Sequence, residues 1–119
     1  MKTSELTGAA LDWAVAKCEG KDNDCEVHAG NVLYGRVTTG FTQYRPSTDW
    51  QQGGPIIERE QIGLDPFADY PRWQAFTPAP EQKDCQPVAY GPTPLIAAMR
   101  CYVASKLGDE VETPEELQS

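Results

Sequence analysis

The strongest constraint on the fold is a segment near the C-terminus that reads as a helix with a defined start and end. Residues 93–108 have the sequence TPLIAAMRCYVASKLG, in which Thr93 can cap a helix and Pro94 suits its first position. Gly108 can take the left-handed conformation that closes many helices. An apolar stripe with helical spacing runs between them, formed by Leu95, Met99, Tyr102, Val103 and Leu107. We therefore predict a helix that packs one face into the core.

A second helix is predicted close to the N-terminus, over residues 3–20. This segment, TSELTGAALDWAVAKCEG, opens with hydroxyl residues that can cap a helix and closes on glycine. Apolar side chains cover two faces, Leu11, Ala14, Val15 and Cys18 on one and Leu6, Ala10 and Trp13 on the other. The width of this apolar surface indicates a helix that lies between a sheet and another element.

The middle of the chain contains two segments that are typical of strands. Residues 32–44, VLYGRVTTGFTQY, are rich in β-branched and aromatic residues and are broken by two glycines, which predicts short strands with a tight turn. Residues 72–76, RWQAF, alternate enough to form another strand. The polar and proline-rich segments are predicted as loops or irregular structure: 21–30, 45–60, 62–70 and 77–87.

These elements predict an α+β fold in a chain of 119 residues, a length that fits one domain with a real core. We expect a single domain over residues 1–108, with a small antiparallel sheet on which the N-terminal and C-terminal helices pack. Residues 109–119 are acidic and are expected to form a frayed tail.

The formal net charge of −8 disfavours general binding of DNA or RNA. Tight binding of a phosphate backbone requires clustered Lys and Arg, whereas acidic residues crowd both ends of this chain. An acidic surface can mimic nucleic acid toward a basic partner, although it more often serves solubility. We therefore expect no nucleic-acid partner.

The sequence also predicts no membrane partner and a cytoplasmic location. No apolar run approaches the roughly 18 to 20 residues that cross a bilayer, and the N-terminus lacks the basic start and apolar core of a signal peptide. In a reducing compartment, the four cysteines, Cys18, Cys25, Cys85 and Cys101, are expected to be free thiols. Cys25 and His28 have a spacing that could suit two metal ligands, but there is no CxxC pair anywhere in the sequence. We predict no metal and no cofactor.

Three segments occur in order along the chain: ELTGAALDWAVAKCEG (5–20), RPSTDWQQGGPIIERE (45–60) and GPTPLIAAMRCYVASKLGDEV (91–111). Together they resemble the NinX-like family of small proteins from lambdoid phages and prophages. The resemblance implies a small accessory phage protein, made in the host cytoplasm, dispensable for the virion and of poorly defined function. It supplies no catalytic residues.

A shorter motif of the form Tyr-x-Pro-Ser with a downstream Asp-Trp is formed by Tyr44, Pro46, Ser47, Asp49 and Trp50. This motif is similar to one in phage proteins that sequester nucleotide immune signals. This similarity implies ligand binding.

The segment 44–59 has the composition of a nucleotide site. It offers aromatic faces, amide donors, a glycine pair and two guanidinium groups, which suit stacking on a base and contacts to phosphate oxygens. The alternative is a loop that buries Trp50 and the isoleucines and leaves its polar residues in solvent.

The GPTP turn before the C-terminal helix is a second candidate, because helix N-termini attract anions. Capping alone is the alternative, since Pro94 removes one donor. Arg100 could reach a ligand or pair with an acidic residue. The residues predicted to contact the ligand are Tyr44, Arg45, Ser47, Asp49, Trp50, Gly53, Gly54, Arg59, Thr93 and Arg100.

Catalysis is not expected, because His28 is the only histidine and its acidic neighbours support it poorly as a base. Carboxylate chemistry at Asp49, Glu58 and Glu60 stays open, since the two glutamates would share a face of a strand. The function we predict is non-catalytic sequestration of a small anionic, nucleotide-like ligand, such as a host immune signal. The alternative is an acidic module that engages and inhibits a host or phage protein. We also expect a homo-oligomer.

Overall fold

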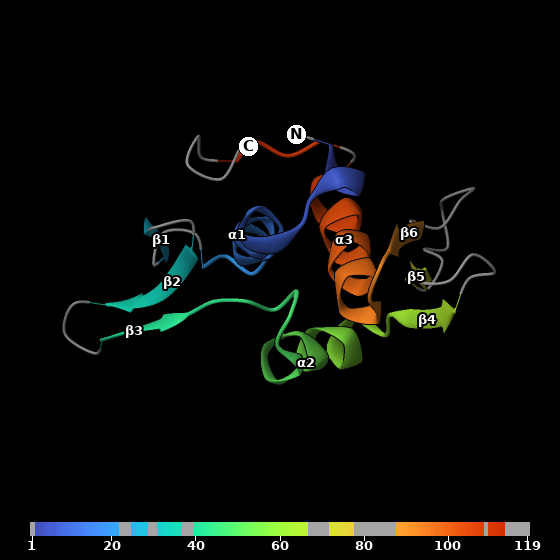
Figure 1. Cartoon of the computed structure of the whole chain (residues 1–119), viewed down its shortest axis with the longest axis horizontal. Helices are drawn as coiled ribbons and strands as arrows, with labels where there is room; N and C mark the ends of the chain where they lie inside the picture. The colour runs from blue at the N-terminus through green and yellow to red at the C-terminus, as the bar shows by residue number, and fades with distance from the viewer. Residues whose placement is uncertain are drawn as a thin grey trace.

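Helix α3 (Pro94–Leu107) lies at the centre of the protein, as Figure 1 shows. The structure is a computed structural model that describes residues 2–21, 25–28, 31–36, 40–66, 72–77, 88–108 and 110–113. Helix α3 contacts α1 (Gly8–Cys18), α2 (Trp50–Glu60) and the three strands that follow α2 along the chain. The predicted N-terminal helix is interrupted, because the single turn η1 (Thr3–Glu5) ends in extended backbone before α1 begins.

The predicted signals of the C-terminal helix are confirmed. The hydroxyl oxygen of Thr93 accepts a hydrogen bond from the amide of Ile96 at 3.1 Å, Pro94 is the first helical residue, and Gly108 ends the helix with a φ of 85°. The apolar stripe is buried, with Leu95, Met99, Tyr102 and Val103 each at most 2% exposed. Local sequence signals and core packing therefore agree along this helix.

The α+β prediction is confirmed, and the strands form two separate antiparallel sheets of three strands each within the described residues. The first sheet has the order β1 (Cys25–His28), β2 (Asn31–Arg36), β3 (Gly40–Gln43). The second has the order β4 (Gly63–Pro66), β5 (Trp73–Phe76), β6 (Val88–Gly91). Figure 1 shows the two sheets at opposite ends of the molecule with α1 and α3 between them.

Three segments predicted as loops or irregular structure contain regular elements. Strand β1 lies within residues 21–30, and strand β4 lies within residues 62–70 and pairs with β5. The largest error concerns residues 45–60, where α2 occupies positions 50–60. Glu58 and Glu60 therefore lie on a helix, and the expectation that they share a strand face is wrong.

Helix α2 forms through a cap and through tertiary packing. The carboxylate of Asp49 accepts a hydrogen bond from the amide of Gln51 at 2.9 Å, and Ile56 is buried. The helix tolerates Pro55 in its second turn and ends at Gln61, which has a left-handed φ of 55°. Because proline lacks an amide hydrogen, it weakens the local preference for a helix at this position.

The two ends of the described chain lie side by side (Figure 1). Lys2 pairs with Glu110 in a single antiparallel bridge, and the hydroxyl of Thr3 donates to the carbonyl oxygen of Gly108 at 2.7 Å. Val111 and Thr113 are buried. Residues 110–113 of the predicted acidic tail therefore pack on the domain rather than fray, and residues 109 and 114–119 lie outside the described residues.

Candidate functional site

Most residues of the predicted site between positions 44 and 54 have structural roles, in capping or packing of α2. Asp49 caps α2, and its carboxylate lies 3.8 Å from Nε of Arg45, whose side chain is 53% exposed. Ser47 is buried, and its amide donates to Oδ1 of Asp12 in α1 at 2.8 Å. Burial raises the pKa of Asp12 to about 6, against hydrogen bonds from Ser47 and the charge of Arg45. These contacts fix the turn before α2 against α1.

The two glycines of α2 differ in their surroundings. A Cβ on Gly53 would overlap the carbonyl oxygen of Pro46 and would lie 2.9 Å from Cδ1 of Leu95, so Gly53 lets α2 pack closely on the preceding turn and on α3. A Cβ on Gly54 would meet nothing within 4 Å. Trp50 at the start of α2 is 55% exposed. The glycine pair thus lies in a helix rather than in an anion-binding loop.

Arg59 forms ion pairs with two carboxylates of the protein, those of Glu19 and Glu60. Its Nη1 and Nη2 atoms donate to the two carboxylate oxygens of Glu19 at 3.0 and 2.6 Å, and its Nε donates to Glu60 at 2.8 Å. The hydroxyl of Tyr102 also donates to Glu19, at 2.5 Å. Burial opposes ionisation of Glu19, but the hydrogen bonds from Arg59 and Tyr102 outweigh it and lower the pKa of the carboxyl. The charge of Arg59 is balanced within the protein.

A pocket of about 520 Å³ lies between the first sheet and α2, and we call it the Tyr44 pocket. The ammonium of Lys21 lies 5.0 Å from the ring centroid of Tyr34 and 5.5 Å from that of Tyr44. Among the predicted site residues, Tyr44 and Arg59 line this pocket. The full lining is Glu19, Lys21, Tyr34, Thr42, Gln43, Tyr44, Gln51, Gln52, Pro55, Ile56 and Arg59.

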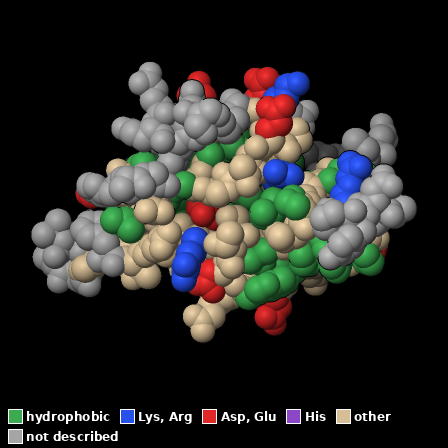
Figure 2. Space-filling view, viewed as in Figure 1, with side chains coloured by type: hydrophobic (Ala, Val, Ile, Leu, Met, Phe, Trp, Pro, Cys, Tyr) green, Lys and Arg blue, Asp and Glu red, His purple; other side chains and the backbone are tan. Residues whose placement is uncertain are grey.

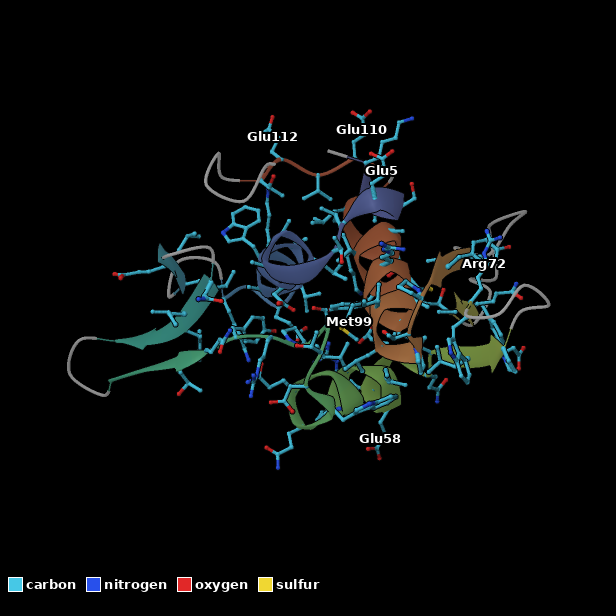
Figure 3. All side chains as sticks on the ribbon, viewed as in Figure 1. Glu5, Glu58, Arg72, Met99, Glu110 and Glu112 are labelled. Carbon is cyan, nitrogen blue, oxygen red and sulfur yellow. The ribbon has the colours of Figure 1, made fainter. Side chains whose placement is uncertain are left out.

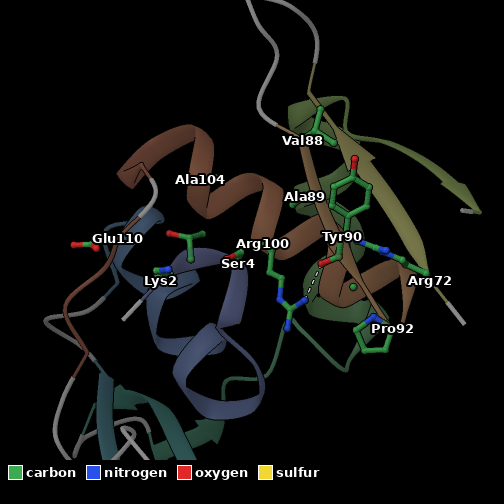
Figure 4. Close-up of a pocket in the computed structure, with 12 residues that line it drawn as sticks. Lys2, Ser4, Arg72, Val88, Ala89, Tyr90, Pro92, Arg100, Ala104 and Glu110 are labelled. Atoms are coloured by element: carbon green, nitrogen blue, oxygen red, sulfur yellow. Dashed lines mark hydrogen bonds between the residues drawn. The ribbon is translucent and has the colours of Figure 1, made fainter. Parts of the chain in front are cut away.

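A second pocket, of about 540 Å³, lies on the face of α3 that looks toward η1 and β6, and we call it the Arg100 pocket (Figure 4). The residues that line it come from both ends of the described chain, from the residue before β5, from β6 and the turn after it, and from α3. They are Lys2, Thr3, Ser4, Arg72, Val88, Ala89, Tyr90, Gly91, Pro92, Arg100, Ala104 and Glu110. The Gly-Pro part of the GPTP turn therefore belongs to a pocket wall.

Arg100 is the half-buried cation at the centre of this pocket. Its Nε donates to the carbonyl oxygen of Leu6 at 2.7 Å, and its Nη1 donates to the carbonyl oxygen of Tyr90 at 2.7 Å. Burial lowers the pKa of its guanidinium. Because both acceptors are neutral, these bonds fix the guanidinium without cancelling its charge. An arginine has five N–H donors, so it can hold both carbonyls and an oxygen of a ligand together.

Two further groups make the Arg100 pocket suitable for an anion that carries a ring. The guanidinium carbon of Arg72 lies 4.7 Å from the ring centroid of Tyr90, whose side chain is partly exposed. Lys2 adds a third cation, and Glu110 is the one carboxylate among the described residues that line the pocket. Cationic side chains thus outnumber carboxylates in this described lining, in a protein whose formal net charge is −8.

The structure therefore separates the residues that were predicted to act together. Tyr44 and Arg59 line one pocket, Arg100 lines the other, and Thr93 caps α3. Sequence reasoning did not identify Lys2 and Arg72, for which the sequence gives no signal. Tyr90 directly precedes the GPTP turn and could have been found from that position.

Metal-binding residues do not gather in the part of the chain that the structure describes: no three His, Cys, Asp or Glu side chains are placed to hold an ion together. Cys18, Cys25 and Cys101 form no disulfide, and Cys85 lies outside the described residues. Burial raises the pKa of Cys18 to about 12 and that of Cys101 to about 11, so both are thiols at neutral pH. The described helices also include none that is long and apolar enough to cross a membrane.

Comparison with known proteins identifies one matching family. The model of the family described as bacteriophage P22, NinX matches residues 2–106. This range includes most of the described residues that line both pockets, together with α1, α2 and α3 as far as Lys106. No curated protein matches the chain.

Proposed function

We propose that this protein, which belongs to the NinX family of bacteriophage P22, is an accessory phage protein that binds a small anionic ligand in the Arg100 pocket. The ligand is nucleotide-like, with a planar ring and a phosphate group, and the protein sequesters it in the host cytoplasm without transforming it. A host antiviral signal is one ligand of this chemical class.

The observation that carries this proposal is the half-buried charge of Arg100, which is held by two neutral carbonyl oxygens. A buried cation is stabilised by an anion, and a guanidinium binds phosphate through parallel hydrogen bonds. The ring of Tyr90 and the guanidinium of Arg72 supply flat surfaces for stacking a base. The pocket volume of about 540 Å³ falls in the range of small-molecule sites.

The Tyr44 pocket supports the same function less well. The charge of Arg59 is already balanced there by Glu19 and Glu60. A phosphate would have to compete with the carboxylates that already hold Arg59. We therefore assign the ligand to the Arg100 pocket.

The first test is mass spectrometry of small molecules released when the purified protein is denatured. The protein is prepared from cells with and without an active nucleotide-signalling defence. Recovery of one intact nucleotide supports sequestration, and recovery of a modified nucleotide would instead indicate catalysis. A folded protein that releases nothing in either preparation would contradict the proposal.

Substitution of two exposed arginines tests whether the ligand binds in the Arg100 pocket. Arg72→Gln removes an exposed cation next to Tyr90, and we expect it to reduce ligand affinity about tenfold, as for loss of a hydrogen bond to a charged group. Arg45→Gln is the matched control, because Arg45 is an exposed arginine outside the Arg100 pocket. Equal losses in the two variants would rule out this pocket.

A second candidate function is an acidic module that binds a basic protein. The observation that favours it is that Glu5, Glu110 and Glu112 project from the same end of the molecule (Figure 3), and all three are exposed. The salt dependence of binding distinguishes the two functions. Affinity that comes from exposed charge contacts falls strongly with ionic strength, whereas affinity for a ligand in a partly desolvated pocket falls less. A partner captured at low salt and lost at about 0.5 M salt would favour this candidate.

A further inference from the structure

We propose that the Tyr44 pocket is a second binding site, which takes a small aromatic carboxylic acid and holds its carboxylate through the ammonium of Lys21. The site is independent of the proposed function, because the Tyr44 pocket and the Arg100 pocket share none of the described residues that line them.

Lys21 is a cation whose partners, within the described residues, are aromatic rings rather than carboxylates. Its ammonium lies 5.0 Å from the ring centroid of Tyr34 and 5.5 Å from that of Tyr44, and its side chain is partly buried. The face of a tyrosine ring attracts a cation but does not neutralise it. The ammonium therefore keeps its charge and its three N–H donors for an anion.

The other charges around the Tyr44 pocket cancel one another. The carboxylate of Glu19 accepts hydrogen bonds from Arg59 and from the hydroxyl of Tyr102. The carboxylate of Glu60 pairs with Arg59 at 2.8 Å and with Lys106 at 3.7 Å. Two carboxylates thus face two cations, and Lys21 adds one positive charge. The single charge of a carboxylate matches it, whereas a phosphate monoester carries about −1.5 to −2 at pH 7.

Hydroxyl groups add further donors to this pocket. Tyr44 is 7% exposed, and its hydroxyl donates to no group of the described residues. Burial raises the pKa of this hydroxyl, so it stays a donor at neutral pH. Thr42 is exposed and lines the same pocket. Because an ionised carboxylate only accepts hydrogen bonds, it suits a pocket whose unused groups are donors.

The wall beside these donors is apolar and partly aromatic. Ile56 is 3% exposed, Pro55 is exposed, and the ring of Tyr34 is partly exposed, and all three line the pocket. An aromatic ring of a ligand can pack on the ring of Tyr34. The volume of about 520 Å³ falls in the range of small-molecule sites.

The test is a titration of the isotope-labelled full chain with phenylacetate, followed by the backbone amide signals in NMR spectra. Phenylacetamide is the neutral probe of nearly the same shape. We expect phenylacetate to shift the amides of Thr42 and Gln51, which line the pocket, and to bind about tenfold more tightly than phenylacetamide. This ratio corresponds to a hydrogen bond to a charged group.

Lys21→Gln tests the cation, and Lys17→Gln is the matched control. The ammonium of Lys17 lies 5.5 Å from the ring centroid of Trp13, a contact of the same kind, but neither residue lines the pocket. We expect Lys21→Gln to weaken phenylacetate about tenfold and to leave phenylacetamide unchanged, and Lys17→Gln to change neither. Tyr44→Phe keeps the ring and removes the hydroxyl, and should weaken phenylacetate about threefold.

Several results would overturn this inference. They are the absence of saturable shifts up to about 10 mM phenylacetate, equal binding of phenylacetamide, equal losses in the two lysine variants, and shifts confined to residues of the Arg100 pocket. None of these results bears on nucleotide binding in the Arg100 pocket, so failure of this inference and failure of the proposed function are distinguishable.

Discussion

Adding one methyl group to each of the two neighbouring glycines of α2 should shift the stability of the protein in opposite directions. In Gly53→Ala the new Cβ would overlap the carbonyl oxygen of Pro46 and lie 2.9 Å from Cδ1 of Leu95. A backbone carbonyl cannot rotate away as a flexible side chain can, so α2 or the preceding turn must shift. Overpacking of this kind costs about 1 to 3 kcal/mol, and the better helix propensity of alanine returns about 1 kcal/mol. Because a backbone atom is involved, we take the upper end and expect a net loss of about 2 kcal/mol.

Gly54→Ala is the control for this prediction, because the same substitution one residue later meets nothing within 4 Å. Only the helix propensity changes there, and we expect a gain of about 0.5 to 1 kcal/mol. The assay is urea denaturation followed by circular dichroism. With an m-value of about 1.5 kcal/mol/M, the midpoint should fall by about 1 M in Gly53→Ala and rise by about 0.5 M in Gly54→Ala.

The reasoning fails if the two midpoints move in the same direction. Two gains would mean that α2 does not pack closely on Pro46 and Leu95, and two losses would mean that residues 53 and 54 are not both helical. A flexible phosphate-binding loop at these positions, as the sequence suggested, would show a loss of ligand binding in both variants with little change in stability.

Three further predictions concern the core, the cap of α3 and assembly. Because burial raises the pKa of Asp12 from 3.8 unfolded to about 6 folded, its contribution to stability is lost as pH rises from about 4 to about 6. Asp12→Asn keeps an acceptor for the amide of Ser47 and should remove up to about 3 kcal/mol of this pH dependence, as measured by urea denaturation between pH 4 and pH 8. Thr93→Ala removes the acceptor for the amide of Ile96 and should cost about 1 kcal/mol in the same assay, whereas Thr93→Ser should cost much less. The homo-oligomer stays a prediction, supported by hydrophobic side chains that gather over α2 and β4 in Figure 2; light scattering should give a mass above 13.1 kDa, and a monomer at all concentrations would refute it.

Helix α3 could be predicted because its determinants are local. Thr93, Pro94 and Gly108 each act within one turn of the helix, and the apolar stripe follows from the helical period alone. Strands β2 and β3 could be predicted for a similar reason, since glycine breaks and β-branched or aromatic residues mark them within a few residues, and β5 could be predicted from the alternation in RWQAF.

Helix α2 could not be predicted because its local signals contradict its structure. Gly53, Gly54 and Pro55 each disfavour a helix, and together they read as a turn. The helix is stabilised by contacts that are distant in sequence, in particular burial of Ile56 and close packing of Gly53 on Leu95. Asp49, which caps the helix, is a local sign of it, but the same residue also belongs to the motif that is similar to ligand-binding phage proteins.

The arginines show why composition alone could not identify the site. Arg59 and Arg100 both lie on helices, and both were predicted to contact the ligand. Forty residues upstream of Arg59, the carboxylate of Glu19 accepts two of its hydrogen bonds and balances its charge. Arg100 is held instead by the backbone carbonyls of Leu6 and Tyr90, which orient the guanidinium and leave its charge for another anion.

Under the proposed function, a structural arginine and a binding arginine differ in whether their long-range acceptors are charged. Adding a carboxylate partner to Arg100 should therefore convert the second kind into the first. Ala104 lines the Arg100 pocket one turn beyond Arg100 on α3, so Ala104→Glu would place a carboxylate beside the guanidinium at a favourable helical spacing. We expect this variant to keep or slightly raise the melting temperature and to lose ligand binding, because the new carboxylate satisfies the charge that the ligand would otherwise meet. The matched control, Ala104→Gln, has nearly the same volume without the charge, and retained binding there would show that charge rather than bulk blocks the pocket. Equal loss of binding in both variants would mean that the pocket recognises its ligand by shape, and the argument from the unbalanced charge of Arg100 would fail.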